Sequence, residues 1–334
     1  YGMNLSWYMP DLMANQTRSY ANYSTSAAAG ELQAHKYNTT YTKPLVESVW
    51  TSAYSVIVNA NEALLKIDGR KDAMDDINYH VIKGELLAVR AMMHFQLLRL
   101  YGYGNWAERK AELDAKKTIP YVTTVNKNIT EQATGAEMFA HLTSDLTNAL
   151  DLLKDYDPVC GTHDAAFYAN VNDDGFYSTR NNRLNYYAVK ALLAQVYMRE
   201  GSSESLAKAL PICEELIGKL ADGVNIRFDN SNTFLLTLSD PGTLNKQNAS
   251  LVNEALFDVS INNLDQKMSN YINPVYASTD YNAIYLTADQ MTDIYGADDA
   301  SLDVRATVLL SQNLNGDDQG YVPVKLYQKN LGTY

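Results

Sequence analysis

The residues of this chain that could perform acid–base chemistry are aspartates that lie close together in the sequence. Hydrolysis of a glycosidic bond needs two carboxyl groups, one of which must stay protonated near neutral pH. Two groups of aspartates satisfy the requirement for proximity: Asp173 with Asp174, and Asp298 and Asp299 with Asp303. Both groups lie in polar, turn-like sequence, where we expect neither carboxyl group to be shielded from water. A helical glycoside hydrolase therefore remains a minor alternative.

Metal and cofactor sites are not indicated by any motif. Residues 170–181 resemble a calcium loop only superficially, because asparagine stands at the first ligand position and Asn181 replaces the bidentate glutamate. We predict a turn at residues 170–175 instead. No nucleotide-binding or hydrolase signature is present, and the histidines lack metal-ligand spacing: His35, His80, His94, His141 and His163. We therefore expect a protein without catalytic activity, cofactor or metal.

Tyrosine is the most unusual feature of the composition, with 25 tyrosines against 7 phenylalanines. A tyrosine offers a flat apolar face and a hydroxyl group, which suits polar, ring-shaped ligands such as sugars. Many tyrosines also lie at the boundary of a core, so each single residue has this second interpretation. Aromatic and polar side chains interleave in two segments, and these supply the candidate glycan-binding residues: Trp7, Tyr8, Asn15, Tyr20, Tyr23, Tyr276 and Tyr281.

The charge of the chain excludes some partners. A formal net charge of −12 argues against a nucleic-acid surface, which needs a basic stripe. No polybasic cluster for anionic lipids and no apolar run long enough to span a membrane is present. Cys160 and Cys213 could pair in an oxidising compartment or could be small buried hydrophobic residues.

The element that organises the scaffold is a predicted helix over residues 81–102, which is apolar around most of its circumference. Such a helix needs other helices on several sides. Asp75 and Asp76 can cap its start, and Gly102 can end it. Glu85, Arg90 and His94 interrupt the apolar surface, and we expect a buried polar seam in which Arg90 and Glu85 pair with or cap neighbouring groups.

Further helices should pack around this element as hairpins. Residues 44–67 form an amphipathic helix, which makes an antiparallel hairpin with residues 81–102. Thr134 and Glu137 fit a capping box that opens the next helix. A second hairpin combines residues 184–200 and 203–220.

Within this second hairpin, Gly201 should end the first helix, Ser203 should cap the second, and Pro211 should kink it. The short glycine-containing turn between the helices is typical of tetratricopeptide-like packing. We expect five residues to line the inner face of the second helix: Leu206, Leu210, Cys213, Ile217 and Leu220.

Large loops with few strands complete the predicted fold. We expect mostly loop, with one short helix near residues 10–16, before residue 44, and surface loops in the segments after residue 102 and over 156–183. Extended segments are predicted at 119–122, 254–259 and 322–327, with a capped helix at 287–295. The sequence therefore predicts an all-α fold of tetratricopeptide-like helical hairpins with large irregular loops and a few short strands.

Several motifs resemble the SusD/RagB family in order and spacing. Residues 84–102, GELLAVRAMMHFQLLRLYG, resemble the family's central helix, and residues 183–197, RLNYYAVKALLAQVY, resemble its later helix. Shorter matches are NANEALL at 59–65, Ile119-Pro120, EALF at 254–257 and DVR at 303–305. We expect several departures from the family pattern: this sequence shows neither the lipidated N-terminal cysteine nor a later helical segment, and Pro211 and the charged insert after Trp106 are unusual.

The resemblance implies a single SusD-like domain over residues 1–334, trimmed at both ends. Its helical scaffold would lie mainly at 44–221, with ligand-facing parts at 1–43 and 222–334. It further implies a surface lipoprotein of the outer membrane, anchored only through a lipid, that captures oligosaccharides or other nutrients for a SusC-like, TonB-dependent transporter. The alternative that remains open is a tetratricopeptide-like scaffold that binds a peptide or a protein.

Overall fold

The structure, a computed structural model, describes residues 8–16, 18–19, 27–221, 255–259, 284–296, 303, 306, 310–312 and 320–323. The chain divides into two compact units, each treated by itself below. The sheet unit comprises Tyr1–Val49, Asp229–Val252 and Ile261–Tyr334, and the helical unit comprises Trp50–Phe228 and Asn253–Ser260. Whether the whole chain is one domain stays a prediction.

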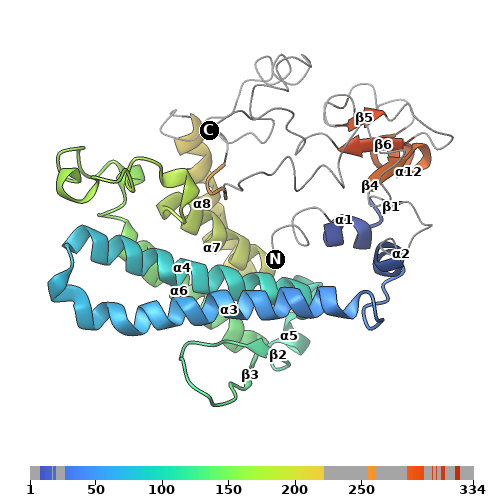
Figure 1. Cartoon of the computed structure of the whole chain (residues 1–334), viewed down its shortest axis with the longest axis horizontal. Helices are drawn as coiled ribbons and strands as arrows, with labels where there is room; N and C mark the ends of the chain where they lie inside the picture. The colour runs from blue at the N-terminus through green and yellow to red at the C-terminus, as the bar shows by residue number, and fades with distance from the viewer. Residues whose placement is uncertain are drawn as a thin grey trace. The chain divides into compact units, whose positions relative to one another are not determined.

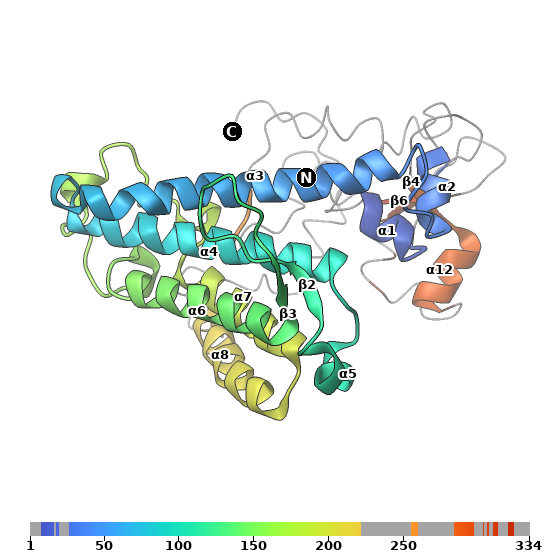
Figure 2. The ribbon, with the colours of Figure 1, turned by 90° about the horizontal axis from the view of Figure 1, so that it is seen from below.

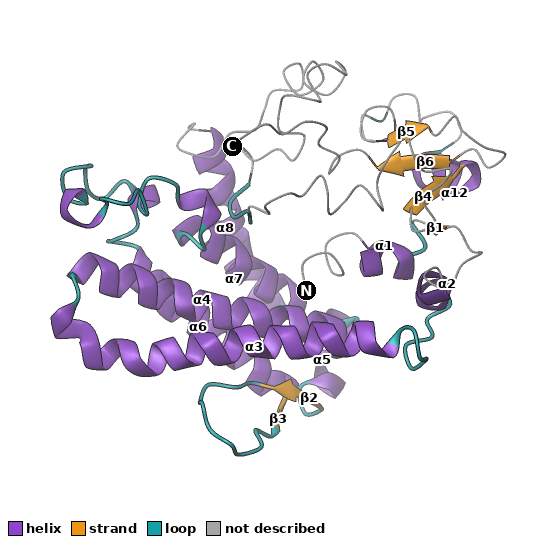
Figure 3. Ribbon diagram, viewed as in Figure 1, coloured by secondary structure: helices purple, strands orange, loops and turns teal. Residues whose placement is uncertain are grey.

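Five helices account for most of the helical unit. Figures 1 and 2 show α3 beside α4, followed by α6, α7 and α8, each packed against the next. The bounds are Lys43–Ile67 for α3, Asp76–Tyr101 for α4, Gly135–Leu153 for α6, Tyr186–Glu200 for α7 and Ser203–Ala221 for α8. This arrangement confirms the predicted all-α fold, in which strands are few and short (Figure 3).

The predicted central helix is α4, and its burial explains its composition. Asp75 is its N-cap and accepts a hydrogen bond from the backbone N–H of Ile77 at 2.8 Å. Gly102 follows the last turn of α4 with φ −88°, which any residue can adopt. Glycine is therefore not required here for a left-handed conformation. A Cβ atom at this position would lie 2.4 Å from the carbonyl oxygen of Leu98, which leaves no space for a side chain.

Helices α4 and α6 approach each other closely at a second glycine. A Cβ atom at Gly84 would lie 2.8 Å from Cγ of Leu153 and 3.2 Å from the carbonyl oxygen of Ala149. Helix α6 turns an apolar face to this contact, and Thr134 and Glu137 form the predicted capping box at its start. The core of the helical unit is therefore built on this helix pair.

The segment after α4 contains more structure than the sequence predicted. Its charged stretch forms a short helix, α5 (Trp106–Leu113), because Trp106 and Leu113 are buried in the core while the charged side chains face outward. Strand β2 (Lys117–Pro120) pairs antiparallel with β3 (Gln132–Thr134). The prediction of a plain surface loop was wrong for α5, because Trp106 and Leu113 bury one side of this charged segment.

The second predicted hairpin is present as α7 and α8. Asn185 caps α7 by accepting a hydrogen bond from the N–H of Ala188, and Gly201 ends it with φ +77°, as predicted. The capping prediction for α8 was wrong by one residue. Ser202 accepts the hydrogen bond from the N–H of Ser205, and Ser203 is the first helical residue. The helix continues through Pro211.

The predicted inner face of α8 was also wrong. Leu206, Leu210 and Ile217 are exposed, Leu210 to 60%, whereas Cys213 is half-buried. The face turned to the core carries Ala209 and Leu216. Helix α8 carries apolar residues on more than one side, so its periodicity alone does not determine which side packs against α7. The side chain of Leu220 lies outside the described residues.

The sheet unit is built from short elements: α1 (Met9–Met13), β1 (Arg18–Ser19), α2 (Ala27–Gln33), β4 (Ile284–Thr287), α12 (Ala288–Tyr295), β5 (Leu310–Gln312) and β6 (Gly320–Pro323). Its strands are ordered β1-β4-β6-β5, and each described pair is antiparallel. Helices α1 and α12 confirm the short helix predicted near residues 10–16 and the capped helix predicted at 287–295. Strand β6 ends at Pro323, and residues 324–327 lie outside the described residues.

Two smaller predictions are resolved in the helical unit. Residues 255–259, part of a predicted strand, are irregular, because their polar groups bond to residues 181 and 185 rather than to another strand. Cys160 and Cys213 do not form a disulfide. Burial raises the pKa of the Cys160 thiol to about 12, so this residue behaves as a small hydrophobic side chain.

Candidate functional site

Of the seven predicted glycan-binding residues, Tyr8 and Asn15 belong to the described part of the chain. Tyr8 is only 9% exposed, so its ring is core rather than an open platform. Asn15 is exposed and adopts the left-handed conformation, with φ 56°. The remaining five lie outside the described residues: Trp7, Tyr20, Tyr23, Tyr276 and Tyr281.

The structure joins the two segments that carry these residues, although 265 positions separate Ser19 from Ile284. Strand β1 pairs with β4 in the register Arg18↔Tyr285 and Ser19↔Ile284. At the end of α1, the carbonyl oxygen of Asn15 accepts a hydrogen bond of 2.6 Å from Nε2 of Gln290 in α12. No pattern in the sequence predicts this pairing.

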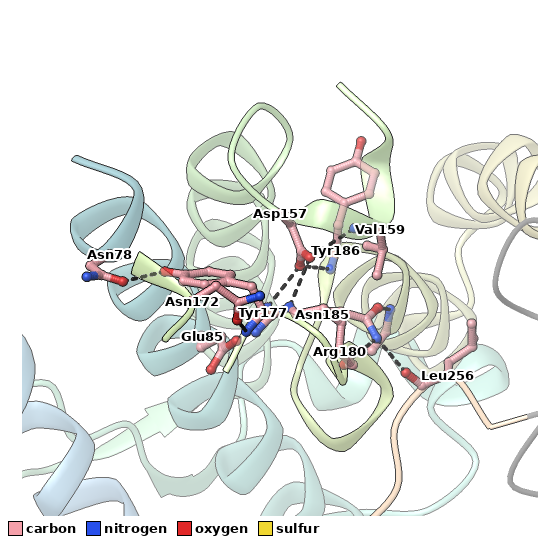
Figure 4. Close-up of polar contacts among 11 residues, drawn as sticks. Asn78, Glu85, Asp157, Val159, Asn172, Tyr177, Arg180, Asn185, Tyr186 and Leu256 are labelled. Carbon is pink, nitrogen blue, oxygen red and sulfur yellow. Dashed lines mark hydrogen bonds and ion pairs between the residues drawn. The ribbon is translucent and has the colours of Figure 1, made fainter. Parts of the chain in front are cut away.

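In the helical unit, the most strongly constrained polar group beside a cavity is the Arg180 cluster, formed by Arg180, Asp157 and Glu85 (Figure 4). The guanidinium donates from Nε to Oδ1 of Asp157 at 3.0 Å and from Nη2 to Oδ2 at 3.1 Å. Nη2 also lies 2.6 Å from Oε1 of Glu85 in α4. Nη1 is buried and has no hydrogen-bond partner among the described residues.

Asp157 also fixes the start of α7. Its carboxylate is fully buried and accepts from the backbone N–H groups of Tyr186, at 3.0 Å, and Val159, at 3.3 Å. A carboxylate at a helix N-terminus interacts favourably with the helix dipole. Each oxygen of Asp157 therefore accepts two hydrogen bonds, and the position of Arg180 is tied to that of α7.

A cavity of about 310 Å³ lies against this cluster. Residues from the loop before α7, the start of α7 and the segment at 255–256 line it: Pro158, Val159, Tyr177, Ser178, Arg180, Asn181, Asn185, Tyr187, Ala255 and Leu256. Two hydrogen bonds hold the segment at 255–258 in place. Nδ2 of Asn185 donates to the carbonyl oxygen of Leu256 at 2.8 Å, and the N–H of Asp258 donates to the carbonyl oxygen of Asn181 at 2.9 Å.

Burial raises the pKa of the Glu85 carboxyl group, and the charge of Arg180 opposes this shift. A carboxyl group with a raised pKa beside a second carboxyl group is an arrangement that acid–base catalysis can use. Glu85 and Asp157 are both bound to Arg180, however, and neither lines the cavity. The pair stabilises the loop and has no access to a substrate in that cavity.

A second arginine cluster occupies the predicted polar seam of α4. Arg90 donates from Nε and Nη2 to the two oxygens of Asp145 in α6, at 2.7 and 2.6 Å, and from Nη1 to Oδ1 of Asn61 in α3 at 3.1 Å. The hydroxyl of Tyr121 donates to the same carboxylate at 2.6 Å. The prediction that Arg90 and Glu85 pair with neighbouring groups is confirmed, with Asp145 and Arg180 as partners.

His94, one turn after Arg90, is fully buried in the same seam. Its Nδ1 lies 2.9 Å from the carbonyl oxygen of Arg90, and its Nε2 accepts from the N–H of Val122 at 2.9 Å. Its ring stacks on that of Tyr121. Burial lowers the pKa of His94 to about 4, so the imidazole is neutral at physiological pH and serves packing.

Of the remaining candidates for chemistry, Asp298 and Asp299 lie outside the described residues. Asp173 and Asp174 are exposed in the predicted turn, where Gly175 has φ +75°. Across the described ranges, no three His, Cys, Asp or Glu side chains are placed to hold a metal ion. A membrane-spanning helix is likewise absent from the described helices.

The chain also matches known proteins. The SusD-like family, described as "Starch-binding associating with outer membrane", matches residues 6–172, half of the chain. The chain belongs to the SusD-like family. No protein with curated function matches it.

Three solved structures show the same SusD-like fold. A protein named as a candidate sugar-binding protein from Bacteroides vulgatus has a TM-score of 0.62 at 21% identity, covering 95% of this chain and 61% of its own. A SusD superfamily protein from Bacteroides thetaiotaomicron has a TM-score of 0.58 at 19% identity, covering 84% and 55%. Surface glycan-binding protein A from Bacteroides uniformis has a TM-score of 0.62 at 14% identity, covering 95% and 63%.

This SusD-like chain thus spans about three fifths of the length of these structures. The chain shares the fold of these structures. The motifs at residues 84–102 and 183–197 correspond to α4 and α7. The sequence missed the cavity, because Arg180 and Asp157 lie in a loop without periodicity. The one available signal was Asn185 immediately before an apolar helix, the pattern of an N-cap.

Proposed function

We propose that this SusD-like chain captures a glycan at the surface of the outer membrane without altering it chemically. The family match over residues 6–172 carries the proposal, because it includes both the central helix and the start of the aromatic segment. The family's description names starch binding and outer-membrane association, and two of its structural neighbours are named for sugar or glycan binding. By the same reasoning, a SusC-like, TonB-dependent transporter is its proposed partner and a lipid anchor its proposed attachment.

The proposed contact surface is the aromatic region of the sheet unit. The pairing of β1 with β4 supports it, since Tyr20 directly follows β1 and Tyr281 precedes β4 by three positions. Asn15, which lies just after the last residue of α1, contributes an exposed amide. Aromatic rings with amides beside them suit sugars, which have an apolar ring face and a rim of hydroxyl groups. Because Tyr8 is buried, we assign it to the support of this surface.

The test is alanine substitution of Trp7 and of Tyr281, with affinity for a panel of neutral polysaccharides measured by affinity gel electrophoresis. Each substitution should weaken binding roughly fivefold to tenfold, the size of one lost stacking contact. Tyr41→Ala is the matched control, because Tyr41 is an exposed tyrosine outside the proposed surface. Equal binding by the two variants and the control would contradict the assignment.

Protein binding is the second candidate function, and the exposed leucines of α8 favour it. Leu206 and Leu210 lie one turn apart, and Ile217 continues the same apolar stripe. A tetratricopeptide-like scaffold would use such a stripe to bind a peptide or a partner protein. Leu206→Glu combined with Leu210→Glu should then abolish partner binding and leave polysaccharide affinity unchanged. A loss of polysaccharide affinity in this variant would argue against two separate surfaces.

A further inference from the structure

The cavity beside the Arg180 cluster has walls of two kinds. Pro158, Val159 and Leu256 are apolar, and Val159 packs with Tyr187 and Leu216 in a small hydrophobic cluster. The rest of the lining is mostly polar and includes Ser178, Asn181, Asn185 and Arg180. A ligand that fits the cavity should therefore present both apolar and hydrogen-bonding groups to it.

Some of these polar groups are already occupied, and others are available. The side-chain oxygen of Asn185 accepts from Ala188, and its nitrogen donates to the carbonyl oxygens of Arg180 and Leu256. The Asn181 amide and the Tyr187 hydroxyl form no hydrogen bond with any described residue. Ser178 accepts from Asn172 at 3.1 Å, which leaves its hydroxyl hydrogen free to donate.

The charges around the cavity favour no ionic ligand. Arg180 is paired with Asp157 and lies 2.6 Å from Glu85, so its charge is compensated and attracts a carboxylate or phosphate only weakly. A cation would need carboxylate oxygens that face the cavity, and neither Asp157 nor Glu85 lines it. The available amide and hydroxyl groups therefore fit a neutral ligand that carries hydroxyl groups.

The size of the cavity limits the ligand further. About 310 Å³ is at the lower end of the range of small-molecule sites, roughly 300–1,000 Å³, and accommodates one ring rather than a chain of rings. The hydrogen bonds from Asn185 and Asp258 fix the wall at 255–256 without a ligand. Such preorganisation lowers the entropic cost of binding.

We infer that this cavity is a subsite for a single neutral sugar ring, located on the helical scaffold and separate from the aromatic surface of the sheet unit. The inference rests on the proposed function for the class of ligand and on the cavity itself for size, charge and hydrogen-bonding groups. Asn181, Ser178 and Tyr187 bind the hydroxyl groups of the sugar. Val159 and Leu256 contact its apolar face.

The experiment measures binding of methyl glycosides of neutral monosaccharides, and of glucuronic acid, to the full chain by saturation-transfer NMR and calorimetry. At least one neutral glycoside should bind saturably, and the acidic sugar should bind at least about fivefold more weakly. Asn181→Ala should weaken neutral binding about fivefold, the size of a lost hydrogen bond. Asn182→Ala is the matched control, since Asn182 is the adjacent asparagine and does not line the cavity.

Ala255→Phe provides an independent variant, because a larger side chain at this lining position should fill the cavity and abolish monosaccharide binding. The inference is overturned if no neutral glycoside binds saturably, or if Asn181→Ala binds as tightly as Asn182→Ala. If the chain binds polysaccharides but no monosaccharide, the subsite is overturned and the proposed function stands. If it binds a monosaccharide, Ala255→Phe removes this binding, and no polysaccharide binds, the proposed function is overturned and the subsite stands.

Discussion

The helical unit contains two buried arginine clusters that start from the same chemistry and differ in their surroundings. In each, an arginine donates two hydrogen bonds to an aspartate, Arg90 to Asp145 and Arg180 to Asp157. Arg90 is enclosed by helices and uses its third nitrogen to bond Asn61. Arg180 lies between a loop and α7, leaves Nη1 without a described partner, and borders a cavity.

The difference shows that a buried ion pair does not by itself mark a functional site. The Arg90 cluster joins α3, α4 and α6, and each of the three guanidinium nitrogens donates a hydrogen bond to another helix. Arg180 has a second counter-ion, Glu85, and it orders a loop that lines the cavity. The elements around a pair decide whether it only supports packing or also shapes a site.

The largest effect on stability is expected for the cluster of Arg90 and Asp145. Asp145→Ala should lower the free energy of unfolding by about 3–5 kcal/mol, because it leaves the Arg90 charge buried without a counter-ion. Urea unfolding followed by circular dichroism measures this change. Replacing both partners, Arg90→Met with Asp145→Leu, should cost less than the single substitution. A larger loss in the double variant would show that the pair itself, rather than the orphaned charge, supplies the stability.

The pH dependence of stability should come from the titration of His94, which lies beside Arg90 in the polar seam of α4. Its pKa is about 4 in the folded protein against an ordinary value of 6.5, because of burial, so the folded state binds fewer protons between these values. Its contribution is therefore complete above pH 6.5 and is lost as the pH falls toward 4, by roughly 3 kcal/mol. Arg90, Asp145 and His141 are the charged or titratable groups that act on it.

His94→Gln is the control for this dependence, since glutamine can accept the hydrogen bond from Val122 without titrating. Unfolding experiments at a series of pH values should give a flatter profile for this variant than for the parent chain between pH 6.5 and 4. Parallel profiles would assign the pH dependence to other groups.

Asp157→Ala tests the Arg180 cluster and should cost about 2–3 kcal/mol, less than Asp145→Ala. Glu85 remains 2.6 Å from Arg180 and still compensates its charge. The N–H groups of Val159 and Tyr186 lose their acceptor, so hydrogen exchange at the start of α7 should increase. Equal costs for the two aspartate variants would remove the distinction between the clusters.

The smallest effect is expected at an exposed pair outside both clusters. Lys208 and Glu204 form an ion pair one helical turn apart on α8. Because both side chains are solvated, Glu204→Ala should leave the urea midpoint unchanged. A clear shift would mean that ion pairs in this unit contribute to stability regardless of burial, and the comparison of the two clusters would lose its basis.

Local chemistry in the sequence determined most of the helical scaffold. Asp75, Thr134 and Thr287 cap helices where the sequence predicts them, because capping depends on a few neighbouring residues. The burial of α4 followed from its apolar circumference, and so did the pairing of Arg90 and Glu85 with other groups, since a buried charge requires a partner.

The tertiary structure alone decided which partners these groups have and which surfaces are exposed. Asp145 and Arg180 lie 55 and 95 positions from Arg90 and Glu85, and periodicity contains no information about such distances. The outward leucines of α8, the burial of Tyr8 and the pairing of β1 with β4 depend in the same way on which elements meet. The cavity is the clearest case, because three segments that are separate in the sequence enclose it.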